Sequence, residues 1–202
     1  MVYAELLTVA DVEGQINFDL TDNSDHILDL IAAVREKGES IMRRALKPTT
    51  KTLTFDCFPS GRGVIEIPDP PLRSITSVKY YDGNGVEETL SSTLYRVIIN
   101  NQNPNQPSYI LPAYGEVWPT TRDDVAVVNL SYICGYGTIE VSTNVFDTID
   151  LPKSIKQWML INIANLFENP ETVIVGNANK LAAVDISSIA DSLISNFRVH
   201  KW

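Results

Sequence analysis

The sequence has few of the residues that build reactive centres. Its 202 residues include only two histidines and two cysteines. Cys57 and Cys134 lie far apart and neither belongs to a C-x-x-C pair, so no zinc site is expected. Both stand in strand-like contexts. We expect both to be buried thiols, which suits a reducing cytosol.

Long hydrophobic runs are also missing. No apolar stretch approaches the roughly 18 residues of a transmembrane helix. At the N-terminus no basic segment precedes an apolar run, so no signal peptide is predicted. We therefore expect no membrane partner, and a protein that is made and used in the cytoplasm or in something assembled there.

Positive charge is scarce. There are 16 Lys and Arg against 25 Asp and Glu, which gives a formal net charge of −9. Sequence-independent binding of nucleic acid depends on neutralising phosphates, so this balance argues against DNA as a tightly held ligand. Residues 1–34 contain seven acids and no Lys or Arg, and bases follow directly afterwards. One explanation is a helix with acids at its start and bases at its end. The other is a polar face that contacts another subunit, with Arg35, Arg43 and Arg44 as candidate interface residues.

The remaining polar motifs do not match known catalytic patterns. His26 stands among acids but has no second ligand at i+4, so we expect an ordinary surface histidine. The glycine-rich segments Ser60–Gly63 and Asp82–Gly85 lack the Lys-Ser/Thr of a phosphate loop and are read as turns. The sequence thus predicts no catalytic residue, no cofactor and no metal ligand, and we expect a protein that is not an enzyme.

Helical patterns occupy both ends of the chain. Thr8 and Asp11 form a helix-start signature. A longer helix follows, with an apolar stripe from Ile27 to Ala45, and Pro48 ends it. Two more helices are predicted, one from Pro152 to residue 169 and one after Asp185.

The middle of the chain, residues 50–137, has the pattern of short antiparallel strands. Ile75–Tyr81 and Val86–Leu90 flank the turn Asp82–Gly85 and predict a hairpin. Further strands are expected at Thr52–Phe58, Val64–Ile67, Leu94–Ile99, Tyr109–Leu111 and Val125–Ile133. The predicted class is α+β: a helical core of about four helices, from residues 1–49 and 138–202, with an antiparallel β insertion (50–137) between the second and third helices.

Several short motifs resemble one known family when they are taken in order. They are Leu6–Val12, Met42–Leu46, Thr52–Pro59, Ile67–Val78, Asp82–Leu90, Leu94–Val97, Trp118-Pro119, Gly135–Gly137, Leu151–Lys156, Asn165–Glu171 and Phe197–Val199. Each motif is weak alone, but their order is specific and spans nearly the whole chain. The sequence resembles the head–tail connector (adaptor) family of long-tailed bacteriophages, which also includes adaptors of phage-like gene transfer agents.

The resemblance implies a structural subunit that forms a ring, expected to be dodecameric, beneath the portal vertex. Such a ring joins the DNA-filled head to the tail and forms part of the DNA channel. The implied partners are other copies of the chain, the portal protein, and a tail-completion or head-closure protein. DNA would pass through without sequence-specific binding. The implied location is the head–tail junction of a virion assembled in the bacterial host cytoplasm, and the family offers no catalytic residues to carry over.

The residues themselves add three expectations. An acidic surface suits a conduit that must not hold DNA, so some acids within residues 1–34 or at the strand ends are expected to face the channel. Ring closure needs two different patches, for which the β insertion and the long second helix are candidates. The C-terminal segment mixes hot-spot residue types and is predicted to dock on the portal or a neighbour: Phe197, Arg198, Val199, His200, Lys201 and Trp202. The alternative is a frayed terminus.

Three other functions remain open at this point. The chain could be another head- or tail-completion protein of the virion. It could be a β-rich carbohydrate- or peptide-binding module with an aromatic platform made of Tyr80, Tyr81, Tyr109, Tyr114 and Trp118. It could also be an enzyme of a type that the sequence does not reveal.

Overall fold

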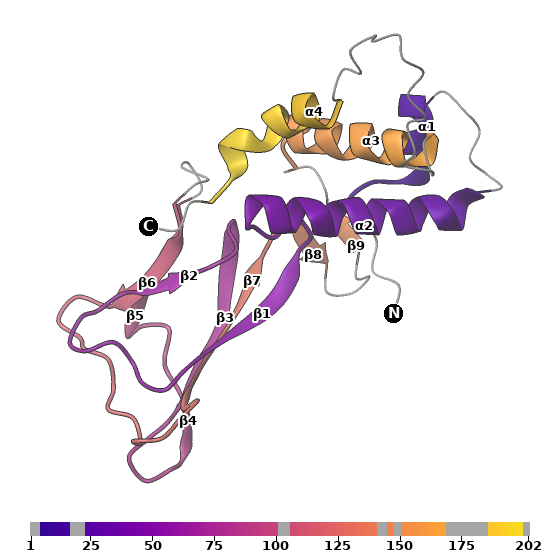
Figure 1. The fold of residues 1–202 in the computed structure, drawn as a ribbon. Helices are drawn as coiled ribbons and strands as arrows, with labels where there is room; N and C mark the ends of the chain where they lie inside the picture. The colour runs from indigo at the N-terminus through magenta and orange to yellow at the C-terminus, as the bar shows by residue number, and fades with distance from the viewer. Residues whose placement is uncertain are drawn as a thin grey trace. The chain divides into compact units, whose positions relative to one another are not determined.

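The structure, a computed structural model, describes residues 5–16, 23–100, 106–140, 145–147, 151–168 and 186–199. Helices α1 (Val9–Ile16) and α2 (Ser24–Met42) precede all the described strands, and helices α3 (Lys153–Glu168) and α4 (Ile186–Ile194) follow them (Figure 1). The predicted α+β class is confirmed.

The chain divides into two compact units. The helical unit contains the residues up to Met42 together with Gly137–Arg198. The β unit runs from Arg43 to Tyr136 and also includes Val199. Each unit is described separately below.

Helix α1 begins with a reciprocal cap. The backbone N–H of Asp11 donates to Thr8 Oγ1 (3.2 Å), and the backbone N–H of Thr8 donates to Asp11 Oδ2 (3.0 Å). Each side chain therefore accepts from a backbone N–H at the start of the helix, where backbone acceptors are scarce. The helix start that the sequence predicted at Thr8 is confirmed.

Helix α2 buries one side of its surface. Its buried residues are Ile27, Ile31, Val34, Gly38 and Met42. They recur at helical spacing, as the sequence predicted. The predicted end of this helix was too late, because Arg43 takes a positive φ of 53° and the helix ends at Met42. The stop therefore comes from the backbone at Arg43, before Pro48 is reached.

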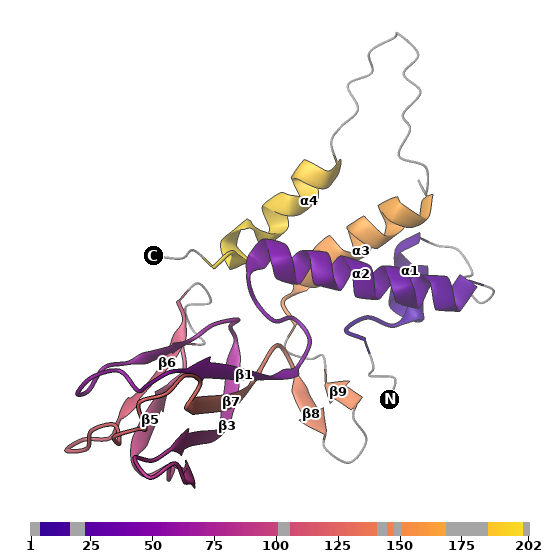
Figure 2. The same cartoon turned by 60° about the horizontal axis from the view of Figure 1, so that its bottom comes forward.

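Helix α3 is the centre of the helical unit, because it contacts α1, α2 and α4 (Figure 2). Four of its side chains are wholly buried: Ile155, Trp158, Met159 and Ile163. The unit also contains a short antiparallel pair, β8 (Thr138–Glu140) with β9 (Val145–Asp147). The sequence pattern did not predict this pair.

The β unit contains two antiparallel sheets. The four-stranded sheet has the order β1 (Thr49–Phe55), β7 (Val128–Cys134), β3 (Leu72–Tyr81), β4 (Glu87–Thr89). The three-stranded sheet has the order β2 (Ile65–Ile67), β6 (Ser108–Pro112), β5 (Tyr95–Ile98). Strands β3 and β4 form the predicted hairpin, in which Tyr81 is paired with Glu87.

The two sheets share one hydrophobic core. Buried and less buried residues alternate along β6 and β7, which is the period of a strand with one face inward. A single cluster of buried side chains joins Ile67 and Ile110 of one sheet to Val78, Leu130 and Tyr132 of the other. The β unit is therefore a small sandwich with its core between the sheets.

Two predictions about this unit were wrong in detail. Cys57 is exposed, because β1 ends at Phe55 and Cys57 lies in the following loop, whereas Cys134 is buried as expected. Strand β7 begins at Val128, later than the predicted Val125, because Ala126 has a φ of 57° that interrupts an extended chain.

The chain leaves the last strand of the β unit through a sharp bend. Gly135 has a φ of 113°, and its N–H donates to Pro71 O (2.9 Å). A Cβ at this position would lie 2.4 Å from the carbonyl oxygen of Lys47. The next residue, Tyr136, donates its N–H to Leu46 O (2.9 Å). Only glycine fits at the first position of this bend.

Candidate interaction surfaces

Side chains in the described residues do not assemble a metal centre. No group of three His, Cys, Asp or Glu in this part of the chain is placed to hold a metal ion. None of its helices combines the length and hydrophobicity needed to cross a membrane. His26 is exposed, as the sequence predicted.

Arg35 connects α2 to the chain before α1. Its Nε donates to Glu5 Oε2 (2.9 Å) and its Nη1 to Glu39 Oε2 (3.1 Å). Burial alone would lower the pKa of the Arg35 guanidinium, but the surrounding carboxylates raise it above its usual value. Only 12% of this side chain is exposed. Arg35 is thus engaged within the helical unit.

Arg44 is one of the most buried side chains of the β unit. It is 2% exposed and donates a hydrogen bond to the hydroxyl of Tyr136. Burial raises the pKa of that hydroxyl, and the Arg44 guanidinium offsets the effect only in part. Arg44 therefore lies inside this chain and not on the surface expected of an interface residue. Of the three candidate arginines, only Arg43 is exposed.

The predicted docking segment at the C-terminus is described in part. The 3-10 helix η2 (Ser195–Phe197) leads into it. Phe197 and Val199 are half-buried, and Arg198 is exposed. His200, Lys201 and Trp202 lie outside the described residues.

The five rings proposed as a carbohydrate platform do not share an exposed surface. Trp118 is buried, stacks on Phe58 with 4.9 Å between ring centroids, and donates its Nε1–H to Gly63 O (2.7 Å). Tyr80 meets the same Phe58 edge-on. Tyr81 and Tyr109 are half-buried, which leaves Tyr114 as the exposed ring among the five.

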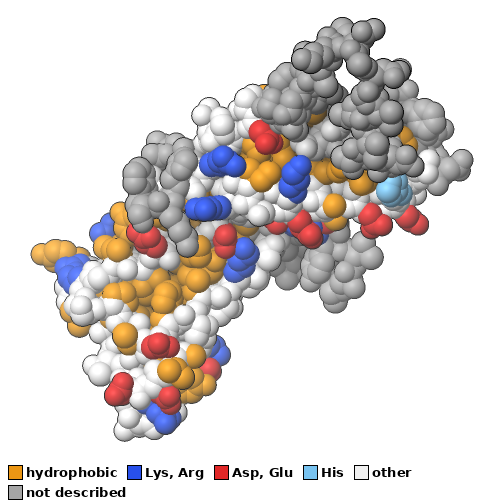
Figure 3. Space-filling view, in the orientation of Figure 1, with side chains coloured by type: hydrophobic (Ala, Val, Ile, Leu, Met, Phe, Trp, Pro, Cys, Tyr) orange, Lys and Arg blue, Asp and Glu red, His pale blue; other side chains and the backbone are white. Residues whose placement is uncertain are grey.

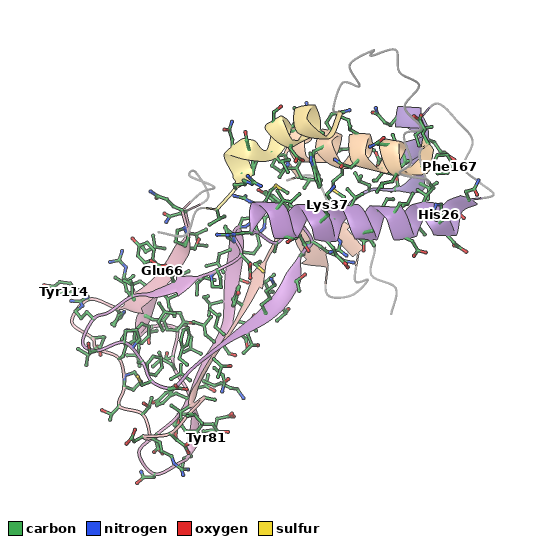
Figure 4. The ribbon with its side chains drawn as sticks, viewed as in Figure 1. His26, Lys37, Glu66, Tyr81, Tyr114 and Phe167 are labelled. Atoms are coloured by element: carbon green, nitrogen blue, oxygen red, sulfur yellow. The ribbon has the colours of Figure 1, made fainter. Side chains whose placement is uncertain are left out.

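Tyr114 belongs to an exposed patch at one end of the β unit, which the sequence did not predict. Three loops meet there, and we call their exposed side chains the loop-end patch: Arg62, Val64, Leu94, Tyr114 and Val117. Tyr114 is 91% exposed and Val117 is 64% exposed. Figure 4 shows the Tyr114 side chain at the outer end of its loop. The sequence signal that could have pointed to this patch is an aromatic residue directly before a glycine, Tyr114-Gly115.

A second surface lies on α2. Asp25, Leu28 and Asp29 are all exposed, with Leu28 at 40%. They occupy positions i, i+3 and i+4 of the helix, so they share one face. We call this the α2 acidic face. Figure 3 shows acidic side chains beside the single histidine coloured there. Within the described residues, neither Asp25 nor Asp29 has an ion-pair partner.

The tip of the β3–β4 hairpin is ordered by one carboxylate. Asp82 Oδ1 accepts from the N–H groups of Val86 (2.8 Å) and Asn84 (2.9 Å). These hydrogen bonds hold the pKa of the Asp82 carboxyl below its usual value. The predicted turn is confirmed, and Val86, which follows it, is exposed. Its polar groups are satisfied within the turn itself.

Comparison with known proteins by sequence finds nothing: no family model matches the chain, and no curated protein matches it. Comparison by structure finds clear matches. A chain from the virion of a native gene transfer agent (GTA) particle has a TM-score of 0.71 at 17% identity, covering 100% of this chain and 95% of that one. This chain has the fold of a GTA neck component.

Two further matches come from GTA necks. A chain from the neck of an empty GTA particle, computed with C6 symmetry, has a TM-score of 0.70 at 17% identity. A chain from the neck of a native particle, computed with C12 symmetry, has a TM-score of 0.65 at 18% identity. Each match covers 100% of this chain and 97% of the other. The resemblance drawn from the ordered motifs is therefore confirmed at the level of fold.

Proposed function

We propose that the chain is a structural head–tail connector (adaptor) subunit of a tailed phage or phage-like particle. It forms a ring under the portal, joins the DNA-filled head to the tail, and lines the DNA channel. The observation that carries this proposal is the shared fold, which extends over the entire chain and nearly all of each GTA neck chain. A match of both units together is more specific than a match of one small domain.

The symmetry of the matched particles supports a ring of identical subunits. One of the matched necks was computed with C12 symmetry, which supports a ring of twelve copies. A ring of this kind needs two different complementary surfaces on every copy. The chain has exposed patches on both of its units that are available for such contacts.

The charge of the chain supports a channel that lets DNA pass. Its formal net charge is −9. Negative surface charge repels phosphates, so DNA would slide along such a surface without being held. We assign the exposed carboxylates within residues 1–34, Asp25 and Asp29 among them, to the neck assembly, where they face either the channel or a neighbouring subunit.

The portal is the proposed partner of the C-terminal segment, residues 197–202. Arg198 is exposed in the described part of this segment. Arginine and aromatic residues are enriched among binding hot spots, and residues 197–202 contain both. Deletion of residues 198–202 is expected to leave the melting temperature unchanged and to abolish attachment to portal particles. Normal attachment by the truncated protein would refute this part of the proposal.

The function is tested by mixing the purified chain with the portal protein encoded by the same genome. Negative-stain images are expected to show a ring seated on the portal. A chain that binds tail-tube subunits but not the portal would instead be a tail-completion protein. A chain that neither forms rings nor binds any virion protein would overturn the proposal, and so would a ring whose channel is lined mainly by Lys and Arg.

A further inference from the structure

The loop-end patch is held rigid by contacts among its three loops. Arg62 donates from Nη2 to Ala113 O (3.0 Å), and its guanidinium carbon lies 5.9 Å from the centre of the Tyr114 ring. The N–H of Ala113 in turn donates to Leu94 O (2.9 Å). Trp118 anchors the same region through its bond to Gly63. A surface fixed in this way loses little conformational entropy on binding.

The composition of the patch is typical of a binding hot spot. Tyrosine and arginine dominate measured hot spots, and here a nearly fully exposed Tyr114 lies against Arg62. Val64, Leu94 and Val117 add exposed apolar surface around this pair. Exposure of an aromatic ring to water does not stabilise the chain, so the position of Tyr114 on an ordered loop suits contact with a partner. The partner must supply an apolar contact for the ring and a negative charge for the guanidinium.

The α2 acidic face has both of these properties. Leu28 offers an exposed apolar side chain, and Asp25 and Asp29 flank it on the same helical face. Neither carboxylate has an ion-pair partner within the described residues, so both are available to a cation from outside. The two surfaces are complementary in charge and both are partly apolar.

We propose that the loop-end patch of one copy binds the α2 acidic face of the next copy, with Arg62 between Asp25 and Asp29 and the Tyr114 ring over Leu28. Every copy carries both surfaces, and a contact between two different surfaces is the kind that propagates around a ring. This inference rests on the proposed ring function and names the surfaces that would close the ring.

The first test maps the contact directly. Unlabelled protein with p-benzoylphenylalanine in place of Tyr114 is mixed with ¹⁵N-labelled wild-type protein and irradiated under conditions where rings form. Mass spectrometry is expected to find crosslinks to labelled peptides from residues 24–36 of the other copy. Crosslinks in assembled rings to any other segment, crosslinks within one copy only, or none at all would overturn the inference.

The second test exchanges the charges. Arg62→Glu alone, and Asp25→Arg/Asp29→Arg alone, are each expected to weaken self-association by at least about tenfold in sedimentation experiments. An equal mixture of the two variants is expected to restore assembly, because each mutated surface then meets its opposite in alternating copies. Restored assembly cannot be explained by misfolding. Failure of the mixture to assemble would contradict the proposed pairing.

Arg96→Glu is the matched control, because Arg96 is an exposed arginine on β5 of the same unit. It makes the same change of charge and is expected to leave assembly unaffected. The outcomes also separate this inference from the proposed function. Rings that form normally in the Arg62→Glu variant would refute the inference and leave the connector function standing. A wild-type chain that never self-associates, with or without its portal, would refute both.

Discussion

In the helical unit, polar side chains connect one helix to another. Lys156 of α3 donates to Asp11 of α1 (2.7 Å), and the Nε1–H of Trp158 in α3 donates to Asp191 of α4 (3.0 Å). In the β unit, the strands are joined by backbone ladders over an apolar core. Ion pairs there, such as Lys79 with Glu87, lie on the surface.

This difference follows from how each element satisfies its backbone. A helix satisfies its own backbone groups, so only side chains can join it to its neighbours. A strand is joined to its neighbours by the backbone itself. The relative positions of the helices therefore depend on specific side chains, and the β unit depends mainly on its alternating apolar pattern. Substitutions and pH are expected to affect the two units differently.

The largest effect is expected from Trp158→Ala. Trp158 is fully buried at the centre of the helical unit, so truncation leaves a cavity and removes its bond to Asp191. We expect a loss of about 3–5 kcal/mol in the free energy of unfolding. Urea unfolding measures the loss, and hydrogen exchange is expected to speed up in α3 and in the helices that contact it, α1, α2 and α4.

Trp118→Ala is the counterpart in the β unit. Trp118 is also buried and also donates one hydrogen bond, but to a backbone oxygen. Faster exchange is expected in the β unit, around Phe58 and Gly63, with the helical unit little changed. If either substitution loosened both units equally, the two would form one cooperative structure and the comparison would fail.

A smaller effect is expected from Gly135→Ala in the β unit. The added Cβ would clash with the carbonyl of Lys47, and the alanine would have to keep a positive φ. Together these effects are expected to lower the free energy of unfolding by roughly 3 kcal/mol. Gly115→Ala is the control, because Gly115 also has a positive φ but has no atom near its Cβ position. It is expected to cost about 1 kcal/mol. Equal losses in thermal unfolding would show that the close approach to Lys47 is unimportant.

Local patterns in the sequence were sufficient for the features that depend on neighbouring residues. The cap between Thr8 and Asp11 spans three residues, and the turn at Asp82 is closed by bonds to Asn84 and Val86. The apolar stripe of α2 also follows from spacing alone, because every third or fourth residue returns to the same side of a helix. The residues that determine these features lie close together in the sequence.

Features that depend on distant residues could not be predicted in this way. Arg44 is buried because its partner Tyr136, 92 residues away, lies beside it. A run of Lys and Arg residues in the sequence suggests a charged surface. No neighbouring residue in the sequence indicates that Arg44 is the buried member of this run. The loop-end patch is likewise assembled from three separate loops around Arg62, Leu94 and Tyr114. The burial of Cys57 was predicted wrongly because the predicted strand ended a few residues too late. Such a shift places a loop residue in the core.

The smallest effect, and the one that depends on pH, is expected from Asp11→Asn in the helical unit. Burial tends to raise the pKa of the Asp11 carboxyl, but its hydrogen bonds with Lys156 and Thr8 outweigh this and hold the pKa below its usual value. A group with a lowered pKa in the folded state stabilises the fold when it is ionised. Its contribution is complete above about pH 5 and is lost as the pH falls below about 4.

Asparagine can still accept the hydrogen bond from Thr8, so Asp11→Asn removes mainly the charge that faces Lys156. We expect a loss of about 1 kcal/mol in the free energy of unfolding at pH 7, because the pair is partly exposed. The difference between wild type and variant is expected to shrink as the pH falls through the lowered pKa of Asp11, in thermal unfolding followed by circular dichroism. Asp123→Asn, an exposed change in the β unit, is the matched control for loss of one carboxylate. A difference that stayed constant as the pH fell would mean that Asp11 acts through its shape and cap. Charge would then no longer distinguish how the helical unit is held together.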